Sequence, residues 1–384
     1  MVENEINERP VEAKILMDAF ALRTGLQENG GNSEERYLWT DAFAVQTFFG
    51  LYHTFGEVTY KDYAFKLIDR VHETLGSYHP DDTRTGKLSG LSGDEARKHP
   101  TAGGLRIGKK LPERLEEQSF NERLEWERDG QYFHYITRWI HALLQAGIES
   151  GEKKYTFWAA ELLLAADKFI YSSGTGIRMY WKMSTDLSRP LVTGMGGHDP
   201  LEGLVCAAAV NEAIPEKAAE LEPITLKFYS MCKNQYWATS DSLGIGGLLL
   251  NTVKAASLEE TGDLPPSSKP KRLLEESIES LEDYQNLKEF DYDASRRLAF
   301  RECGLSLGLR SLHGAKEDLL EKGMAVEKIE DYLYLAEEIE KFWKEPSNQQ
   351  VSTWIDHLNI NAVSLAASLV ARTYPEVFSG KKRD

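Results

Sequence analysis

Acidic side chains and one histidine stand at the starts of apolar segments of the sequence. Asp41, Asp129, Asp199 and Asp356 each lie where such a segment begins. A carboxylate in this position can simply cap a helix. Carboxyl groups that meet at one opening can also divide the work of a general acid and a general base. These four aspartates, together with His198, whose imidazole can exchange a proton near neutral pH, are the candidate catalytic residues.

Helical spacing groups further polar side chains near these acids. His134, Arg138 and His141 are separated by four and then three residues, so they share one face of a helix. We expect His141, two turns into the helix, to be a core residue. Arg138 can hold a carboxylate or hydroxyl groups with its planar guanidinium. His198 and Glu202 are again four residues apart. More histidines would be needed for a metal site, so none is predicted.

Tryptophans near the acids are candidate ligand platforms. Trp39 and Trp354 stand close to two of the aspartates, and Trp181 lies in a strand-like segment. Aromatic faces stack on the apolar faces of a ligand while neighbouring polar groups take its hydroxyls. Core packing is the alternative for Trp39 and Trp354. The complete set of candidate binding residues is Trp39, His134, Arg138, Trp181, Glu202, Trp354, His357 and Arg106.

Two kinds of helix alternate along the chain and would position these residues. One kind is apolar on nearly every face and must be surrounded by protein, whereas the other is apolar on one side and lies outside. We expect inner helices near 37–55, 130–149, 199–213, 241–257, 294–313 and 353–372, and outer helices near 10–23, 59–75, 154–172, 217–233, 271–287 and 326–344. This pattern predicts an all-α ring of about twelve helices in a single domain over residues 1–384.

Two connections are too long to be turns. Residues 77–128 and 174–197 are rich in glycine, arginine and aromatic residues and have few charge runs. Long connections inside a compact domain are commonly functional, so both are predicted to be ordered active-site loops. Alternating apolar residues in the second one indicate a short β-hairpin.

Composition excludes several classes of function. The 384-residue chain is 41% hydrophobic, enough for a large core, and its net charge of −16 disfavours nucleic-acid binding. Its three cysteines lie in apolar helical stretches without CxxC spacing, as buried thiols would in a reducing compartment. Neither a signal peptide nor a membrane-spanning run is visible. We expect a cytoplasmic protein without a cofactor, since no nucleotide-binding fingerprint follows a strand.

Two motifs carry a resemblance to a known family. Trp39-Thr40-Asp41-Ala42-Phe43 and Asp129-Gly130-Gln131-Tyr132-Phe133-His134-Tyr135 each open an inner helix. With the helix alternation, they make the chain similar to the six-hairpin glycosidase superfamily, whose members fold as an (α/α)6 toroid. Members include glycoside hydrolases, unsaturated uronyl hydrolases, sugar epimerases and isomerases. The resemblance implies a sugar-binding site where the inner helices begin.

The resulting functional prediction is a carbohydrate-active enzyme, with a glycoside hydrolase as the leading hypothesis. One rim carboxyl would donate a proton to the leaving oxygen and another would activate water. Asp129 is the first choice for one role, with Asp41, Asp199 or Asp356 in the other. A sugar epimerase or isomerase that uses histidine proton transfer is the alternative, and a non-catalytic carbohydrate-binding protein is the third. The expected partner is a small-molecule carbohydrate or glycoside, with no nucleic acid or membrane involved.

Overall fold

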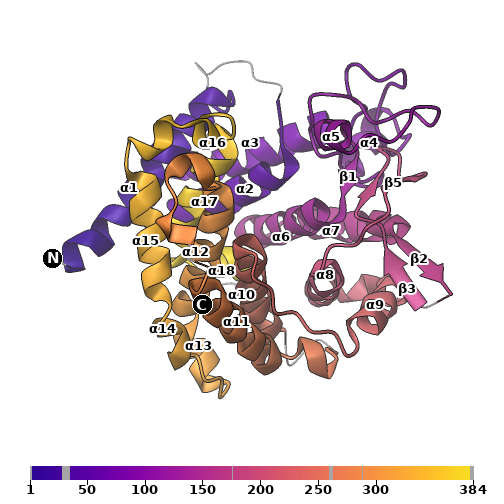
Figure 1. Cartoon of the computed structure of the whole chain (residues 1–384). Coiled ribbons are helices and arrows are strands. Elements are labelled where there is room, and N and C mark those ends of the chain that lie inside the picture. Colours follow the sequence, from indigo (N-terminus) through magenta and orange to yellow (C-terminus); the bar gives the residue numbers. More distant parts are fainter. Residues whose placement is uncertain (1, 28–34, 175, 259–262, 288, 381–384) are drawn as a thin grey trace. The chain divides into compact units, whose positions relative to one another are not determined.

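The computed structural model divides into two compact units (Figure 1). It describes residues 2–27, 35–174, 176–258, 263–287 and 289–380. Unit 1 comprises Met1–Gly31, Phe43–Ala64 and Asn234–Asp384, and unit 2 comprises Asn32–Ala42 and Phe65–Lys233. Helices α2 (Leu38–Phe55) and α3 (Val58–Leu75) contribute to both units. The expectation of one domain over residues 1–384 stays a prediction.

Unit 2 is built on two helix pairs. α6 (Phe133–Ser150) packs against α7 (Lys153–Ala166), and α8 (Asp199–Ala213) packs against α9 (Ala218–Cys232). α6 and α8 also contact each other, and Figure 1 shows α6 and α7 in purple-magenta and α8 and α9 in pink-red. Both are buried along most of their length, as predicted for inner helices. α6 ends at Gly151, whose φ of 72° is the left-handed conformation that glycine adopts readily.

Short strands and two small helices fill the long connections of unit 2. β1 (Gln131–Tyr132), β4 (Lys182–Met183) and β5 (Pro190–Val192) form an antiparallel sheet in the order β1-β4-β5. β2 (Ile170–Ser173) pairs with β3 (Gly176–Met179). The predicted hairpin pattern is confirmed, but the predicted helix over 154–172 is too long, because its last residues pair in β2. α4 (Gly93–Lys98), α5 (Glu122–Glu127), η1 (Asp167–Phe169) and η2 (Pro215–Lys217) complete the unit.

Unit 1 has the same inner and outer arrangement. α10 (Ser242–Ser257) packs against α12 (Ala299–Gly314), which packs against α17 (Leu358–Ala371). The amphipathic helices α11 (Pro270–Gln285) and α15 (Leu333–Lys344) cover α10 and α12, and α1 (Val2–Arg23) covers α17. The shorter elements are η3 (Pro266–Ser268), η4 (Glu289–Asp291), η5 (Ala294–Arg296), α13 (Lys316–Glu321), α14 (Glu327–Glu330), η6 (Asn348–Gln350), α16 (Ser352–Ile355) and α18 (Glu376–Ser379).

Glycine permits the close approach of α10 and α12. A Cβ added to Gly246 would lie 2.1 Å from the carbonyl oxygen of Gly304, and one added to Gly308 would lie 2.5 Å from that of Gly246. Only glycine allows two backbones to come so near. The glycines inside α10 therefore allow close contact between inner helices, although each destabilises the helix by about 1 kcal/mol.

The three helices predicted over 294–313, 326–344 and 353–372 are interrupted in the structure. The last one is divided into α16 and α17, and Asn361 gives a reason for the division. Its Nδ2 donates to the carbonyl oxygens of Thr353 and Trp354, both at 3.1 Å. The Trp354 carbonyl also accepts from the N–H of His357 three residues on, at 3.2 Å, so the regular bonds to the N–H four residues on are replaced here. Across the described part of the chain, no helix combines the length and apolarity that crossing a bilayer requires.

Candidate functional site

Four polar side chains from α6 and α8 and one tryptophan gather in unit 2. We call His134, Arg138, Trp181, Asp199 and Glu202 the α6–α8 cluster. Arg138 forms an ion pair with Oε1 of Glu202, while Thr137 donates a hydrogen bond of 2.9 Å to Oε2. The carboxylate is thus held on both oxygens by adjacent residues of α6. The predicted binding residues Arg138 and Glu202 therefore lie together, bonded to each other.

Asp199 is the first residue of α8 and is 4% exposed. Its Oδ2 accepts a hydrogen bond of 3.0 Å from the backbone N–H of Gly196. Burial raises the pKa of Asp199 to about 7, with a further upward push from the charge of Glu202; the Gly196 N–H and Arg138 act in the opposite direction. Asp199 can therefore hold or release a proton near neutral pH, close to a charged carboxylate.

His134 lies in the first turn of α6 among aromatic rings. Tyr132 stacks on it with ring centroids 5.2 Å apart, and Tyr135 meets it edge-on at 4.7 Å. Trp181 donates its indole N–H to Nδ1 of His134 at 3.3 Å. Burial lowers the pKa of His134 to about 4; Glu202 opposes this shift and Arg138 adds to it. The imidazole is therefore neutral at neutral pH.

Two atoms of the cluster remain available to a ligand. Within the described residues, neither Oδ1 of Asp199 nor Nε2 of His134 has a hydrogen-bond partner. Neither atom belongs to the fully buried side-chain atoms that lack a partner. Both atoms are therefore not fully buried, and each can form a further hydrogen bond. An acidic oxygen and an imidazole nitrogen are thus presented from the starts of two neighbouring inner helices.

Asp129, the first-choice catalytic residue of the sequence analysis, is fully buried in a structural network. Its Oδ2 accepts from Nη1 of Arg106 at 2.6 Å, and its Oδ1 accepts from the N–H groups of Gly108 and Gly130, both at 3.0 Å. Arg106 also donates to the carbonyl oxygens of Thr74 and Ser77. These bonds fasten the end of α3 to the strand before α6. The proposed roles of Asp129 in catalysis and Arg106 in binding stay predictions.

Asp41 is likewise buried, at 2% exposure, in the first turn of α2. It accepts from the N–H of Tyr37 at 3.2 Å and lies 3.8 Å from Nη1 of Arg36. Burial raises the pKa of Asp41, while Arg36 and the Tyr37 N–H oppose the rise. Tyr37 shares a hydrogen bond of 2.6 Å with Tyr135, next to His134. Trp39, at 6% exposure, is a core residue of the same turn.

The last predicted group belongs to unit 1. Asp356 and His357 are exposed between α16 and α17. Trp354 is 2% exposed and stacks on Trp343 with ring centroids 5.7 Å apart. His198, the remaining candidate, is the N-cap of α8 in unit 2, and its carbonyl oxygen accepts from the N–H of Glu202 at 3.0 Å. The functional roles of these four residues stay predictions.

Thr137 and Gly196 were missed by the sequence analysis. Thr137 precedes Arg138, and its hydroxyl donates a hydrogen bond to the carboxylate of Glu202. Gly196 lies directly over Asp199, since an added Cβ would be 2.6 Å from Oδ1. A signal for Gly196 was present, because it stands three residues before Asp199 in the run Gly194-Met195-Gly196-Gly197.

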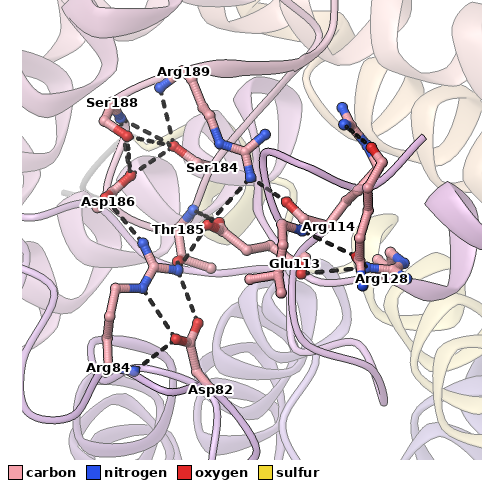
Figure 2. Close-up of polar contacts among 12 residues, drawn as sticks. Asp82, Arg84, Glu113, Arg114, Arg128, Ser184, Thr185, Asp186, Ser188 and Arg189 are labelled. Atoms are coloured by element: carbon pink, nitrogen blue, oxygen red, sulfur yellow. Dashed lines mark hydrogen bonds and ion pairs between the residues drawn. The ribbon is translucent and has the colours of Figure 1, made fainter. Parts of the chain in front are cut away.

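An ion-pair network joins the two long connections of unit 2 (Figure 2). Arg84 donates to Asp82 at 2.8 Å, to Glu113 at 2.7 Å and to Asp186 at 3.0 Å. Glu113, which is 5% exposed, also accepts from the N–H of Thr185 at 2.5 Å. The network fixes the turn between β4 and β5, which follows the strand that begins next to Trp181. The two long connections are thus bonded to each other, and their role as active-site loops stays a prediction.

Lys182, next to Trp181, is fully buried and anchors the same strand. Its Nζ donates to Oε1 and the carbonyl oxygen of Glu125 at 2.9 and 2.7 Å, and to the carbonyl oxygen of Arg128 at 2.8 Å. Burial lowers the pKa of Lys182, whereas Glu125 acts against this shift. With all of these bonds made, Lys182 positions Trp181 and is not available to a ligand. Nowhere in the described residues do three or more His, Cys, Asp or Glu side chains form a group that could hold a metal ion.

Comparison with known proteins shows a likeness in structure. No protein-family model matches the sequence, and no curated protein matches it. The structure is similar to a GH76A α-1,6-mannanase variant from Salegentibacter sp. HEL1_6 described as inactive and in complex with α-1,6-mannotetrose, with a TM-score of 0.54 and 12% identity over 96% of this chain and 99% of that chain. It is also similar to a sugar epimerase from a ruminal bacterium, with a TM-score of 0.52 and 11% identity over 90% of this chain and 87% of that chain.

These likenesses confirm the predicted fold class. The chain has the predicted (α/α)6 fold, and the resemblance inferred from the Trp39 and Asp129 motifs is correct at the level of fold. One structural neighbour is a hydrolase and the other an epimerase, so the fold leaves the reaction open.

Proposed function

We propose that the protein is a carbohydrate-active enzyme, and specifically a glycoside hydrolase that uses the α6–α8 cluster. The observation that supports this proposal is the contrast between Asp199 and Glu202. Burial raises the pKa of Asp199 to about 7, whereas Glu202 is ion-paired with Arg138 and accepts a hydrogen bond from Thr137. Two neighbouring carboxyl groups in such different environments are suited to different roles in catalysis. The presence of an α-1,6-mannanase among the structural neighbours supports the choice of a hydrolase.

In the proposed mechanism, Asp199 donates its proton to the leaving glycosidic oxygen through the open Oδ1. Glu202 provides negative charge against the positive charge that develops on the sugar ring. His134 binds a hydroxyl through Nε2, and the ring of Trp181 lies beside it as an apolar platform. Asp41 and Asp129, which belong to the same unit as the cluster, stay candidates for the carboxylate that activates water.

The test is hydrolysis of a glycoside panel by the wild-type protein and by Asp199→Asn. Loss of the acid should lower kcat by about 100-fold or more, with a smaller loss for substrates whose leaving group needs no protonation. Asp283→Asn, which removes an exposed carboxylate on α11 of unit 1, is the matched control. Full activity of Asp199→Asn would remove Asp199 from the mechanism. Ligand-induced thermal stabilisation without turnover would point to the non-catalytic binder.

A sugar epimerase is the second candidate, and one observation favours it. The open Nε2 of His134 lies in the same cluster as Asp199, and one structural neighbour is a sugar epimerase. An epimerase would exchange a carbon-bound proton of a free sugar with solvent without cleaving a bond. Deuterium incorporation from D2O into free sugars, followed by mass spectrometry, therefore separates the two reactions.

A further inference from the structure

We infer that the indole N–H of Trp181 locks His134 in one tautomer, with the ring proton on Nε2, so that His134 serves as a hydrogen-bond donor. Trp181 is then a positioning residue that acts through His134. The donation of that proton to a sugar rests on the function proposed above, whereas the tautomer itself does not. This positioning role is additional to the platform role proposed above for the ring of Trp181.

The contact between Trp181 and His134 has only one possible donor. An indole nitrogen can only donate, and the acceptor in the contact of 3.3 Å is Nδ1 of His134. A ring nitrogen that accepts a hydrogen bond carries no proton. In a neutral imidazole the single proton must then be on Nε2. The bond from Trp181 thus decides which nitrogen can donate, and the donating nitrogen is the open one.

The surroundings of His134 keep it neutral. Protonation would place an N–H on Nδ1 against the indole N–H. His134 also lies in the first turn of α6, where the helix dipole disfavours positive charge. The charged groups near it are Arg138 on the same helix, which disfavours the imidazolium, and Glu202 on α8, which favours it. Tyr132 and Tyr135 cover the ring from α6 and the residue before it, and Trp181 covers it from the β3–β4 connection.

Trp181 is itself held in place by its neighbours. Trp126 of α5 meets it edge-on with ring centroids 5.1 Å apart, and Tyr132 lies at 5.5 Å. Lys182, the next residue, is bonded to Glu125 and Arg128. The donor can therefore keep its direction without a ligand, which is what preorganisation of a site requires.

The same unit contains a second histidine with the opposite arrangement. Trp139 donates its indole N–H at 3.1 Å to Nε2 of His72, not to Nδ1. By the same reasoning the proton of His72 is on Nδ1. Burial lowers the pKa of His72 to about 3, so this ring is neutral as well. His72 is therefore an internal reference whose tautomer should be the reverse of that of His134.

The experiment is ¹H–¹⁵N long-range correlation NMR of the full-length protein labelled at histidine, with His134→Gln used to assign the His134 signals. At neutral pH the wild type should show Nδ1 of His134 unprotonated and Nε2 protonated, and the reverse for His72. Trp181→Phe keeps an aromatic ring without the donor; it should place part of the proton on Nδ1 and move the titration midpoint of His134 above about 4. Trp126→Phe keeps an aromatic ring against Trp181 and leaves the donor to His134 intact, so it should change neither the position of the ring proton nor the titration midpoint of His134.

The inference is overturned if wild-type His134 carries its proton on Nδ1 or is charged at neutral pH, or if Trp181→Phe leaves the spectrum unaltered. Should Trp181→Phe fail to fold, the wild-type spectrum alone decides the question. Since no substrate is involved, a failed glycosidase assay does not affect the result. Conversely, a wrong tautomer leaves the acid role of Asp199 intact.

Discussion

Replacing Asp199 with asparagine should make the protein more stable at alkaline pH and leave its stability at acidic pH unchanged. The wild-type carboxyl must lose its proton inside the fold, where burial and Glu202 oppose the negative charge. Asparagine is uncharged at every pH and retains an oxygen that can accept from the N–H of Gly196, at 3.0 Å in the wild type. The variant therefore removes the cost of ionisation and keeps the main hydrogen bond.

The magnitude follows from linkage. The pKa of Asp199 is about 7 in the folded protein against an ordinary value of 3.8, and each pKa unit corresponds to about 1.4 kcal/mol. Between these values the folded state binds more protons than the unfolded state, so wild-type stability falls as pH rises from about 4 to about 7. The total cost is about 4 kcal/mol. The N-terminal position in α8 favours the carboxylate by about 0.3–1 kcal/mol, which makes 4 an upper figure.

The assay is urea unfolding of wild type, Asp199→Asn and the control Asp283→Asn between about pH 5 and pH 8, where linkage predicts the effect. The free energy of unfolding of Asp199→Asn should exceed that of wild type by an amount that grows with pH, while the control follows wild type throughout. The reasoning is refuted if the difference in free energy of unfolding between Asp199→Asn and wild type is the same at both ends of this pH range. Such a result would show that Asp199 does not change its protonation in the folded protein within that range.

Three further predictions concern packing and the loops. Gly196→Ala places a Cβ 2.6 Å from Oδ1 of Asp199. It should therefore lower the free energy of unfolding by about 1–3 kcal/mol and reduce glycosidase activity. The control Gly197→Ala, whose Cβ would have no atom within 4 Å, should match wild type in both assays. Glu113→Gln removes the charge that accepts from Arg84 at 2.7 Å and should cost about 1–3 kcal/mol in urea unfolding; the exposed Glu117→Gln should change stability by less than about 0.5 kcal/mol. Gly246→Ala, whose Cβ would lie 2.1 Å from the Gly304 carbonyl oxygen, should lower the melting temperature more than Gly244→Ala, which meets the methyl group of Thr239 at 3.0 Å.

The inner helices could be predicted from the sequence because a helix that is buried on every face has apolar or small residues at most of its own positions. α6 and α17 lack a charged face over most of their length, and the structure buries them accordingly. The spacing of His134, Arg138 and His141 likewise placed these side chains on one face of α6. The interruption between α16 and α17 could not be foreseen, since it depends on the bonds from Asn361 to carbonyl groups seven and eight residues earlier.

The candidate site was predicted in part for the same reason. His198 and Glu202 belong to one helix start, so their proximity follows from periodicity. The bond from Arg138 to Glu202 spans 64 residues, and that from Arg106 to Asp129 spans 23 through an irregular loop. Helix and strand periodicity does not relate residues so far apart in the sequence. A buried aspartate with an arginine partner and a buried aspartate with an unbonded oxygen are alike in sequence, so the sequence could not distinguish the surroundings of Asp129 from those of Asp199.

The charges of the α6–α8 cluster indicate what kind of sugar it can accept. Arg138 is the one cation in the cluster, and its charge is already balanced by Glu202. His134 is neutral at neutral pH, and Asp199 is at most partly ionised there. An anionic sugar would bring a carboxylate to a site without an unbalanced cation, next to Glu202, and would lose its hydration without an ion pair in return. Hydroxyl groups need only the donor and acceptor atoms that His134 and Asp199 leave open. We therefore expect uncharged glycosides to be cleaved in preference to uronic acid glycosides in the panel, and faster cleavage of uronides would contradict this assignment of charges.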